Sequence, residues 1–233
     1  MEETTPKRAL VLFSGGLDST TCLYYAKKKG FHVKALSFDY GQRHQIELVR
    51  AQKIAQNVAD LGHTTIRLDF SAFAEASALT NFKLDIPLGG THLDQQDFIP
   101  ITYVPARNLI FLSYGVAVAE AENISKILIG ANARDYSGYP DCRPDFLQAF
   151  AHAASLATAR GRQSSPIEIE TPLLFLSKKE IVEMALSLGV PIEETWSCYN
   201  PQPSVSGELK PCGQCDSCLL RQRALAELGI REL

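Results

Sequence analysis

The first third of the chain alternates between short apolar runs and longer segments with helical spacing. Strands are predicted at 8–13, 33–38 and 63–68, and helices at 17–29 and 42–61. Short apolar strands that alternate with helices are typical of a parallel sheet covered by helices. The beginning of the chain therefore predicts a βαβαβ unit.

The alternation resumes after an irregular stretch at 71–101, which we interpret as mostly loop. Helices are predicted at 107–122, 145–159 and 177–188, and strands at 125–130 and 167–171. After Pro191 the pattern breaks up, and only 216–228 has helical spacing. We expect an α/β domain in 1–190, with a five-stranded parallel sheet and helices on both faces, and a small C-terminal module in 191–233.

Composition and charge limit the classes of partner. Apolar residues make up 45% of the chain and charged residues 21%, as in globular proteins. The net charge of −3 argues against a protein that holds nucleic acid by its phosphates. The chain has no apolar run of the ~18 residues that cross a bilayer and no signal-peptide pattern at its start. We therefore expect a cytoplasmic protein with neither a membrane nor a direct nucleic-acid partner.

A glycine turn joins the first predicted strand to the first predicted helix. Gly15 and Gly16 permit positive φ and leave no Cβ between the backbone and a ligand, and the amides that open a helix attract anions. Asp18 beside a phosphate would hold Mg²⁺. The alternative is a tight turn in which Asp18 or Ser19 only caps the helix. The candidate nucleotide-binding residues are Phe13, Ser14, Gly15, Gly16, Leu17, Asp18, Ser19, Thr20, Thr21, Cys22 and Leu23.

Four cysteines near the C-terminus have the spacing of a metal site. Cys212, Cys215 and Cys218 lie within seven residues, and Cys198 precedes them across a Pro/Gly/Ser-rich stretch. Four thiolates form a closed tetrahedral zinc site, which would organise a segment without a core of its own. An iron–sulfur cluster is the alternative, but nothing else in the sequence indicates redox chemistry. We therefore predict structural zinc.

A polar loop at 130–144 follows the fourth predicted strand, at the sheet edge where α/β proteins bind ligands. It contains carboxylates, a guanidinium, phenols and the thiol of Cys142. Composition alone supports equally well a solvated loop in which Asp141 caps the next helix.

Six motifs in order resemble those of the 7-cyano-7-deazaguanine synthase family of queuosine biosynthesis, within the N-type ATP pyrophosphatases. They are SGGLDST, VPARN (104–108), SGYPDCRP (137–144), TPLLFLSKKE (171–180), SCYN (197–200) and CxxCxxC. The segment 76–99 contains none of these motifs, and no role is assigned to it. The resemblance implies an adenine nucleotide α-hydrolase-like fold and a homodimer. It also implies an ATP-dependent ligase that converts 7-carboxy-7-deazaguanine and ammonia to a nitrile through adenylated intermediates.

Transfer of AMP requires that the charge on pyrophosphate be neutralised. Candidates for catalysis are Asp18 through Mg²⁺, Ser19 in the loop, Lys178 and Arg107. Lys178 lies just inside a predicted helix start, and the family pattern also has a lysine there. The alternative for Lys178 is a solvated surface lysine.

Candidates for binding the deazapurine acid lie in the polar loop. A guanine-like base presents N–H donors, so Asp135 or Asp141 would accept from it, Tyr136 or Tyr139 would stack on it, and Arg143 would pair with its carboxylate. Covalent catalysis by Cys142 is an alternative that adenylation does not need. Two rival functions are an RNA-modifying pyrophosphatase and a zinc-ribbon nucleic-acid-binding protein with a vestigial loop.

Overall fold

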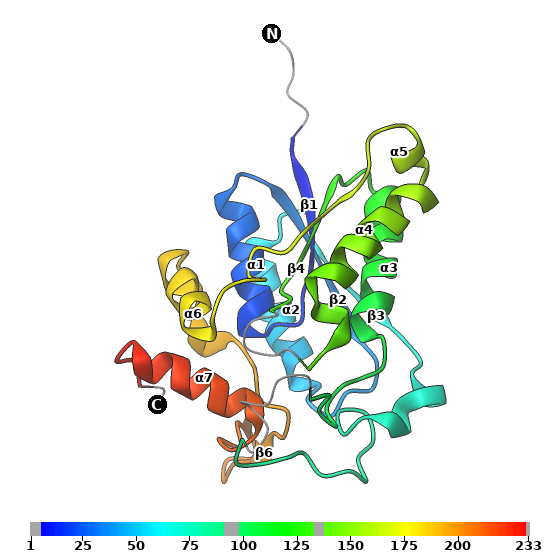
Figure 1. The fold of residues 1–233 in the computed structure, drawn as a ribbon. Helices are drawn as coiled ribbons and strands as arrows, with labels where there is room; N and C mark the ends of the chain where they lie inside the picture. Colours follow the sequence, from blue (N-terminus) through cyan, green and yellow to red (C-terminus); the bar gives the residue numbers. More distant parts are fainter. Residues whose placement is uncertain (1–5, 91–97, 133–137, 232–233) are drawn as a thin grey trace.

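A five-stranded sheet forms the centre of the computed structural model, which describes residues 6–90, 98–132 and 138–231 (Figure 1). Its strands are β1 (Arg8–Leu12), β2 (His32–Asp39), β3 (His63–Arg67), β4 (Lys126–Ile129) and β5 (Glu168–Glu170). Their order is β3-β2-β1-β4-β5, and every pairing is parallel. The predicted five-stranded parallel sheet is therefore confirmed.

Helices cover both faces of this sheet, which explains the continuous apolar runs. Helices α1 (Leu17–Lys28), α2 (Ile46–Val58) and α6 (Lys178–Ser187) pack on one face, and α3 (Arg107–Ala121) and α4 (Pro144–Ala157) on the other. Ala9 and Val11 of β1 join the first core, while Leu10 and Leu12 join the second. Because successive side chains of a strand point to opposite faces, every residue of β1 inside the sheet must be apolar.

Three helix boundaries differ from the sequence prediction by two residues or more: the start of α2, its end at Val58 rather than 61, and the end of α4. Helix α2 begins at Ile46 rather than 42, because the buried Gln42 side chain forms a turn in which Oε1 accepts from Tyr40 N and Nε2 donates to Phe38 O. The helix predicted at 145–159 ends at Ala157, and Thr158 then caps the short α5 (Ala159–Arg162). Hydrogen bonds of side chains to nearby backbone thus set the start of α2 and the end of α4.

The stretch 71–90 is irregular, as expected, but it is anchored at both ends. It contains the 3₁₀ turn η1 (Ser71–Ala76), and Arg43 Nη2 donates to the carbonyls of Asn81 and Leu84. Farther on, Leu88 forms a β-bridge with Cys215, and Gly89 N donates to Gln214 O. The segment therefore contacts Arg43, just before α2, on one side and the C-terminal cysteines on the other.

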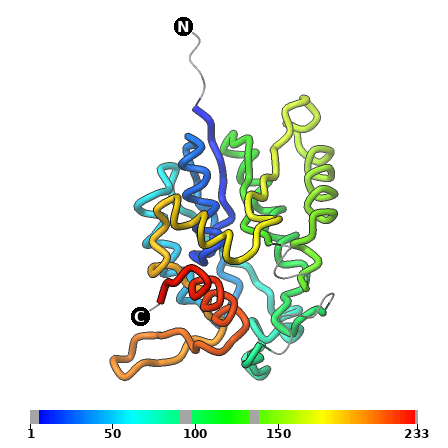
Figure 2. Tube along the Cα trace, turned by 60° about the vertical axis from the view of Figure 1, so that its left-hand side comes forward, coloured from blue at the N-terminus to red at the C-terminus, as the bar shows by residue number. Residues whose placement is uncertain are grey.

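The C-terminal residues lie at the carboxyl end of the sheet strands (Figure 2). They form η3 (Ile192–Glu194), the hairpin strands β6 (Gln202–Pro203) and β7 (Leu209–Lys210), and α7 (Asp216–Glu227). Helix α7 packs on α6 through Ala224 and Leu225, and Trp196 N donates to Gly15 O at 2.9 Å. In the described parts of the chain, none of the helices has the length and apolar character needed to span a membrane.

Candidate active site

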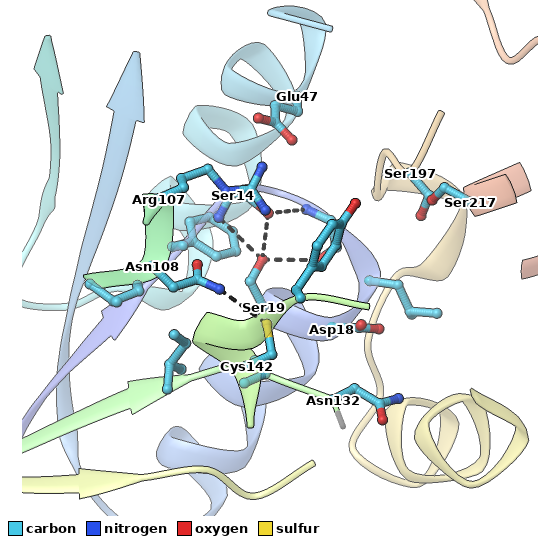
Figure 3. A pocket seen from close by; sticks show the side chains of 18 of the residues that line it. Ser14, Asp18, Ser19, Glu47, Arg107, Asn108, Asn132, Cys142, Ser197 and Ser217 are labelled. Carbon is cyan, nitrogen blue, oxygen red and sulfur yellow. Dashed lines mark hydrogen bonds between the residues drawn. The ribbon is translucent and has the colours of Figure 1, made fainter. Parts of the chain in front are cut away.

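A cavity of about 280 Å³ opens at the carboxyl ends of β1, β2 and β4 (Figure 3). Four helices, α1, α3, α6 and α7, contribute residues of their first turns to its wall, namely Asp18, Asn108, Lys178 and Ser217. The N-terminus of a helix carries a partial positive charge and unpaired amides. First-turn residues of four helices in the wall of one cavity favour an anionic ligand.

The glycine turn forms one side of this cavity. Ser14 Oγ lies 3.1 Å from Ser19 Oγ and accepts from Gly16 N at 3.2 Å, so the two serines hold the turn against α1. Gly15 has φ +81°, as expected. A Cβ on Gly15 would lie 2.6 Å from Ala51 N and Glu47 O of α2. The expectation that Gly15 clears space for a ligand is therefore wrong, since its missing side chain makes room for the backbone of α2.

The remaining candidates of the nucleotide segment divide into two groups. Phe13, Ser14, Gly16, Leu17, Asp18 and Ser19 line the cavity. Thr20, Thr21, Cys22 and Leu23 are buried completely, and the two threonine hydroxyls donate to Gly16 O and Leu17 O. These four residues fix the first turns of α1 against the sheet rather than face the cavity.

Lys178 and Asp18 meet across the cavity from different helices. Lys178 Nζ lies 2.6 Å from Asp18 Oδ1 and 2.7 Å from Oδ2, and both side chains are mostly buried. A capping box holds Lys178, because Ser177 Oγ accepts from Glu180 N and the Glu180 carboxylate accepts from Ser177 N. Lys178 is thus fixed in the cavity wall and is not a solvated surface lysine.

Arg107 enters the cavity from the first turn of α3. The preceding Ala106 has φ +53°, a strained conformation for a residue with a Cβ, and Tyr103 Oη accepts from its amide. Arg107 Nη1 donates to Tyr40 Oη at 3.0 Å. Burial opposes the charge of Arg107, but the phenol oxygens of Tyr40, Tyr139 and Tyr199 together hold its pKa above the ordinary arginine value. The site therefore retains a permanent cation.

Asp141 and Cys142 lie in the 3₁₀ turn η2 (Pro140–Cys142) against α3. Asp141 Oδ2 accepts from Asn108 N at 2.7 Å and so caps α3, while Cys142 Sγ accepts from Asn108 Nδ2 at 3.1 Å. Burial raises the pKa of Asp141, and it raises the pKa of Cys142 to about 12. Cys142 is consequently a neutral thiol near pH 7, which does not suit a nucleophile.

The other substrate candidates have different positions. Tyr139 lines the cavity, and its hydroxyl lies 2.9 Å from Thr102 Oγ1. Arg143 is half-buried at the N-cap of α4. Asp135 and Tyr136 fall outside the described residues. Substrate binding by Asp135, Tyr139, Asp141 and Arg143 stays a prediction.

Several residues of the cavity wall are not among the site residues predicted from sequence. They are His44 just before α2, Glu47 in its first turn, Asn108, and the C-terminal residues Trp196, Ser197, Tyr199, Asp216, Ser217 and Leu220. His44 is buried, which lowers its pKa, and its Nδ1 lacks a hydrogen-bond partner among the described residues. The VPARN motif and the position of Asp216 directly after a cysteine were the available signals.

The four predicted cysteines come together beside the cavity. The sulfurs of Cys198, Cys212, Cys215 and Cys218 all lie within 4.8 Å of one another, and those of Cys212 and Cys218 are 4.0 Å apart. Tetrahedral zinc with Zn–S bonds of ~2.3 Å requires sulfurs about 3.8 Å apart. Amide N–H groups of Cys212 and Asn200 also donate to Cys198 Sγ. The cluster is therefore compatible with zinc.

Known proteins resemble this chain over nearly its whole length. The family model of the queuosine biosynthesis protein QueC matches residues 8–229. This chain belongs to the QueC family. Curated relatives named 7-cyano-7-deazaguanine synthase include one from Desulfatibacillum aliphaticivorans, 49% identical over 99% of this chain and 97% of the relative. Another from Trichodesmium erythraeum (strain IMS101) is 48% identical over 97% of this chain and 98% of its own.

Among solved structures, a predicted subunit of tRNA methyltransferase from Methanocaldococcus jannaschii is 19% identical. The match covers 96% of this chain and 89% of that one, with a TM-score of 0.48. Membership in the QueC family therefore follows from the sequence relatives and the family model, which span nearly the whole chain.

Proposed function

We propose that this protein is a 7-cyano-7-deazaguanine synthase that makes a nitrile from 7-carboxy-7-deazaguanine, ammonia and ATP. The observation that carries the proposal is the similarity, over nearly the whole length of both chains, to relatives with that name. The cavity is consistent with it, since four helix N-termini, Lys178 and Arg107 suit a triphosphate beside a carboxylate substrate.

The reaction must first make a carboxylate oxygen a leaving group. A carboxylate and ammonia in water only exchange a proton, so the acid is adenylated and ammonia then displaces AMP to give an amide. Removal of the amide oxygen requires a second adenylation, so two ATP molecules are consumed for each nitrile.

The residues of the cavity wall divide this work among them. Ser14, Ser19 and the amides of the glycine turn bind the β- and γ-phosphates, while Lys178 leaves Asp18 to neutralise the pyrophosphate as it departs. Arg107, a buried cation of the same wall, adds to the positive charge that neutralises the pyrophosphate. Asp18 would hold Mg²⁺, which supplies further charge neutralisation at the phosphates.

Zinc bound by the four cysteines has a structural role in this proposal, because four sulfurs leave no open position for catalysis. The protein acts in the cytoplasm as a homodimer on free small molecules, without direct contact with nucleic acid. The overall negative charge supports the last point.

The test is to incubate the purified protein with ATP, Mg²⁺, ammonium and 7-carboxy-7-deazaguanine, and to quantify AMP, pyrophosphate and the nitrile by mass spectrometry. Two AMP per nitrile are expected in the absence of RNA. Formation of ADP, or one ATP consumed per nitrile, would contradict the scheme. Turnover that depends on added RNA would favour the RNA-modifying rival.

A further inference from the structure

Asn108 is a cavity residue whose side-chain nitrogen is held by hydrogen bonds, while its side-chain oxygen is directed away from the atoms that hold the nitrogen. Its Nδ2 donates to Cys142 Sγ at 3.1 Å and to Asp141 O at 3.4 Å. Because a carbonyl oxygen only accepts hydrogen bonds, the contact with Asp141 O fixes which end of the amide is the nitrogen. Oδ1 then points away from Cys142 (Figure 3), and no described residue donates a hydrogen bond to it.

The backbone around Asn108 holds it at this position. Its amide nitrogen donates to Asp141 Oδ2 at 2.7 Å, and the strained Ala106 (φ +53°) sets the first turn of α3. Arg107, the preceding residue, lines the same cavity, as do Asp18 and Ser19 of the glycine turn. Asn108 Oδ1 is therefore an oriented neutral acceptor in the cavity that contains the candidate adenylation residues.

Ammonia needs an acceptor of this kind. To attack an acyl adenylate, its lone pair must face the carbonyl carbon, so its N–H groups must be held by other atoms. A carboxylate in this role would favour ammonium, which has no lone pair. A neutral amide oxygen binds the N–H of ammonia without retaining a proton.

We propose that Asn108 Oδ1 accepts a hydrogen bond from the attacking ammonia, and that Cys142 is the positioning residue that fixes the amide in this orientation. This inference rests on the proposed function. The nitrogen lone pair forms the C–N bond, the bond from carbon to the AMP oxygen breaks with its electron pair on AMP, and one proton leaves the nitrogen for water. The products are the amide and AMP.

In this assignment the buried thiol of Cys142 orients the Asn108 amide and forms no covalent bond with the substrate. With its pKa raised to about 12 by burial, the thiol stays protonated and accepts from Asn108 Nδ2. A serine hydroxyl can also accept there, whereas alanine cannot.

The test compares Asn108→Leu, which has a similar size and no acceptor, with the unmodified enzyme. We expect KM for ammonia to rise about tenfold, because the variant loses one hydrogen bond to ammonia. KM for ATP should stay within about twofold. Exchange of labelled pyrophosphate into ATP, measured with the acid and without ammonia, reports adenylation alone and should fall less than nitrile formation. Equal losses in exchange and nitrile formation, or an unchanged KM for ammonia, would overturn the proposal.

Cys142 variants provide the independent arm should Asn108→Leu fail to fold. Cys142→Ala is expected to raise KM for ammonia. Cys142→Ser is expected to have a KM close to that of the unmodified enzyme, because the serine hydroxyl again accepts from Asn108 Nδ2. Equal KM values in both variants would overturn the positioning role. Ser113→Ala, an exposed position on the same helix, is the control for general effects on α3. If the unmodified enzyme makes no nitrile, the proposed function fails instead.

Discussion

Single residues of the glycine turn perform different tasks although they are adjacent. Gly15 lets α2 approach the turn, with Ala51 N and Glu47 O where a Cβ would lie, while Ser14 and Ser19 bind each other at the cavity. Lys178 belongs to the same site although it lies 160 residues beyond Asp18. The glycine turn therefore depends on contacts that its own seven-residue motif does not contain.

Gly15→Ala is expected to lower the free energy of unfolding by about 3 kcal/mol or more, from the left-handed φ and the clash with α2 together. Gly30→Ala is a matched control, since Gly30 has φ +82° and open space at the Cβ position. It should cost about 1–2 kcal/mol. Urea denaturation measures both values. Equal losses would show that the approach of α2 is not what requires Gly15.

Lys178→Met is expected to lower kcat/KM for ATP about 10²-fold, the scale of one lost charge-stabilising donor. Its neighbour Lys179 provides the control, because its side chain is 43% exposed and its ion pair with Glu183 is long, at 3.9 Å. Lys179→Met should stay within about twofold in steady-state kinetics. Full activity of Lys178→Met would place Lys178 outside the catalytic machinery.

At this scale the sequence predicted residue types better than residue partners. Asp18, Lys178 and the four cysteines were recognised because motif and spacing are local properties. Asn108 and Glu47 were missed, because their positions in the wall depend on how α3 and α2 begin. Gly15 is needed because α2 packs against the turn, and sequence alone does not show where α2 packs.

Among the elements, η2 and α3 are joined by a buried carboxylate. Asp141 caps α3 through Asn108 N, so η2 is held against the first turn of α3. Strands and helices were predictable from periodicity, but this joint was not, since an Asp in a polar loop is equally compatible with capping α4. The predicted helix boundaries were wrong where a side chain forms a hydrogen bond with nearby backbone, as at Gln42 and Thr158.

The joint predicts a dependence of stability on pH. Because the folded pKa of Asp141 is raised by burial, the folded chain binds more protons than the unfolded chain at pH values above about 3.9, up to that raised pKa. The contribution of Asp141 to the free energy of unfolding therefore falls as pH rises through this window. Asp141→Asn keeps an oxygen for Asn108 N but does not titrate.

Urea denaturation of the unmodified protein and Asp141→Asn over a pH series measures this contribution, because subtraction cancels the other groups. Stability of the unmodified protein relative to the variant is expected to decline through the window and then level off. A difference that rises with pH would contradict the role of burial.

For the whole molecule, the cysteine module is part of the cavity rather than an appendage. Trp196, Ser197, Tyr199, Asp216, Ser217 and Leu220 line the cavity, and the hydrogen bond from Trp196 N to Gly15 O ties the module to the glycine turn. The sequence indicated a separate region at 191–233 because its hydrophobic pattern differs. It did not indicate that this region completes the site.

Cys212→Ser is therefore expected to lower bound zinc and to abolish nitrile formation while most of the far-ultraviolet circular dichroism remains, since the sheet lies outside the module. Metal content by mass spectrometry and activity are measured on the same preparation. Ser206→Ala, in the exposed turn between β6 and β7, should retain both. Full activity of zinc-free protein would contradict the role of the module.

The place of the module in the chain has a consequence for synthesis on the ribosome. All five sheet strands have emerged once Glu170 has left the exit tunnel, but the fourth sulfur and Leu220 follow much later. A nascent chain thus completes the strands of its sheet before the last residues of the cavity wall are made. Premature termination before Cys218 would release a chain with all five sheet strands but without a complete cavity wall.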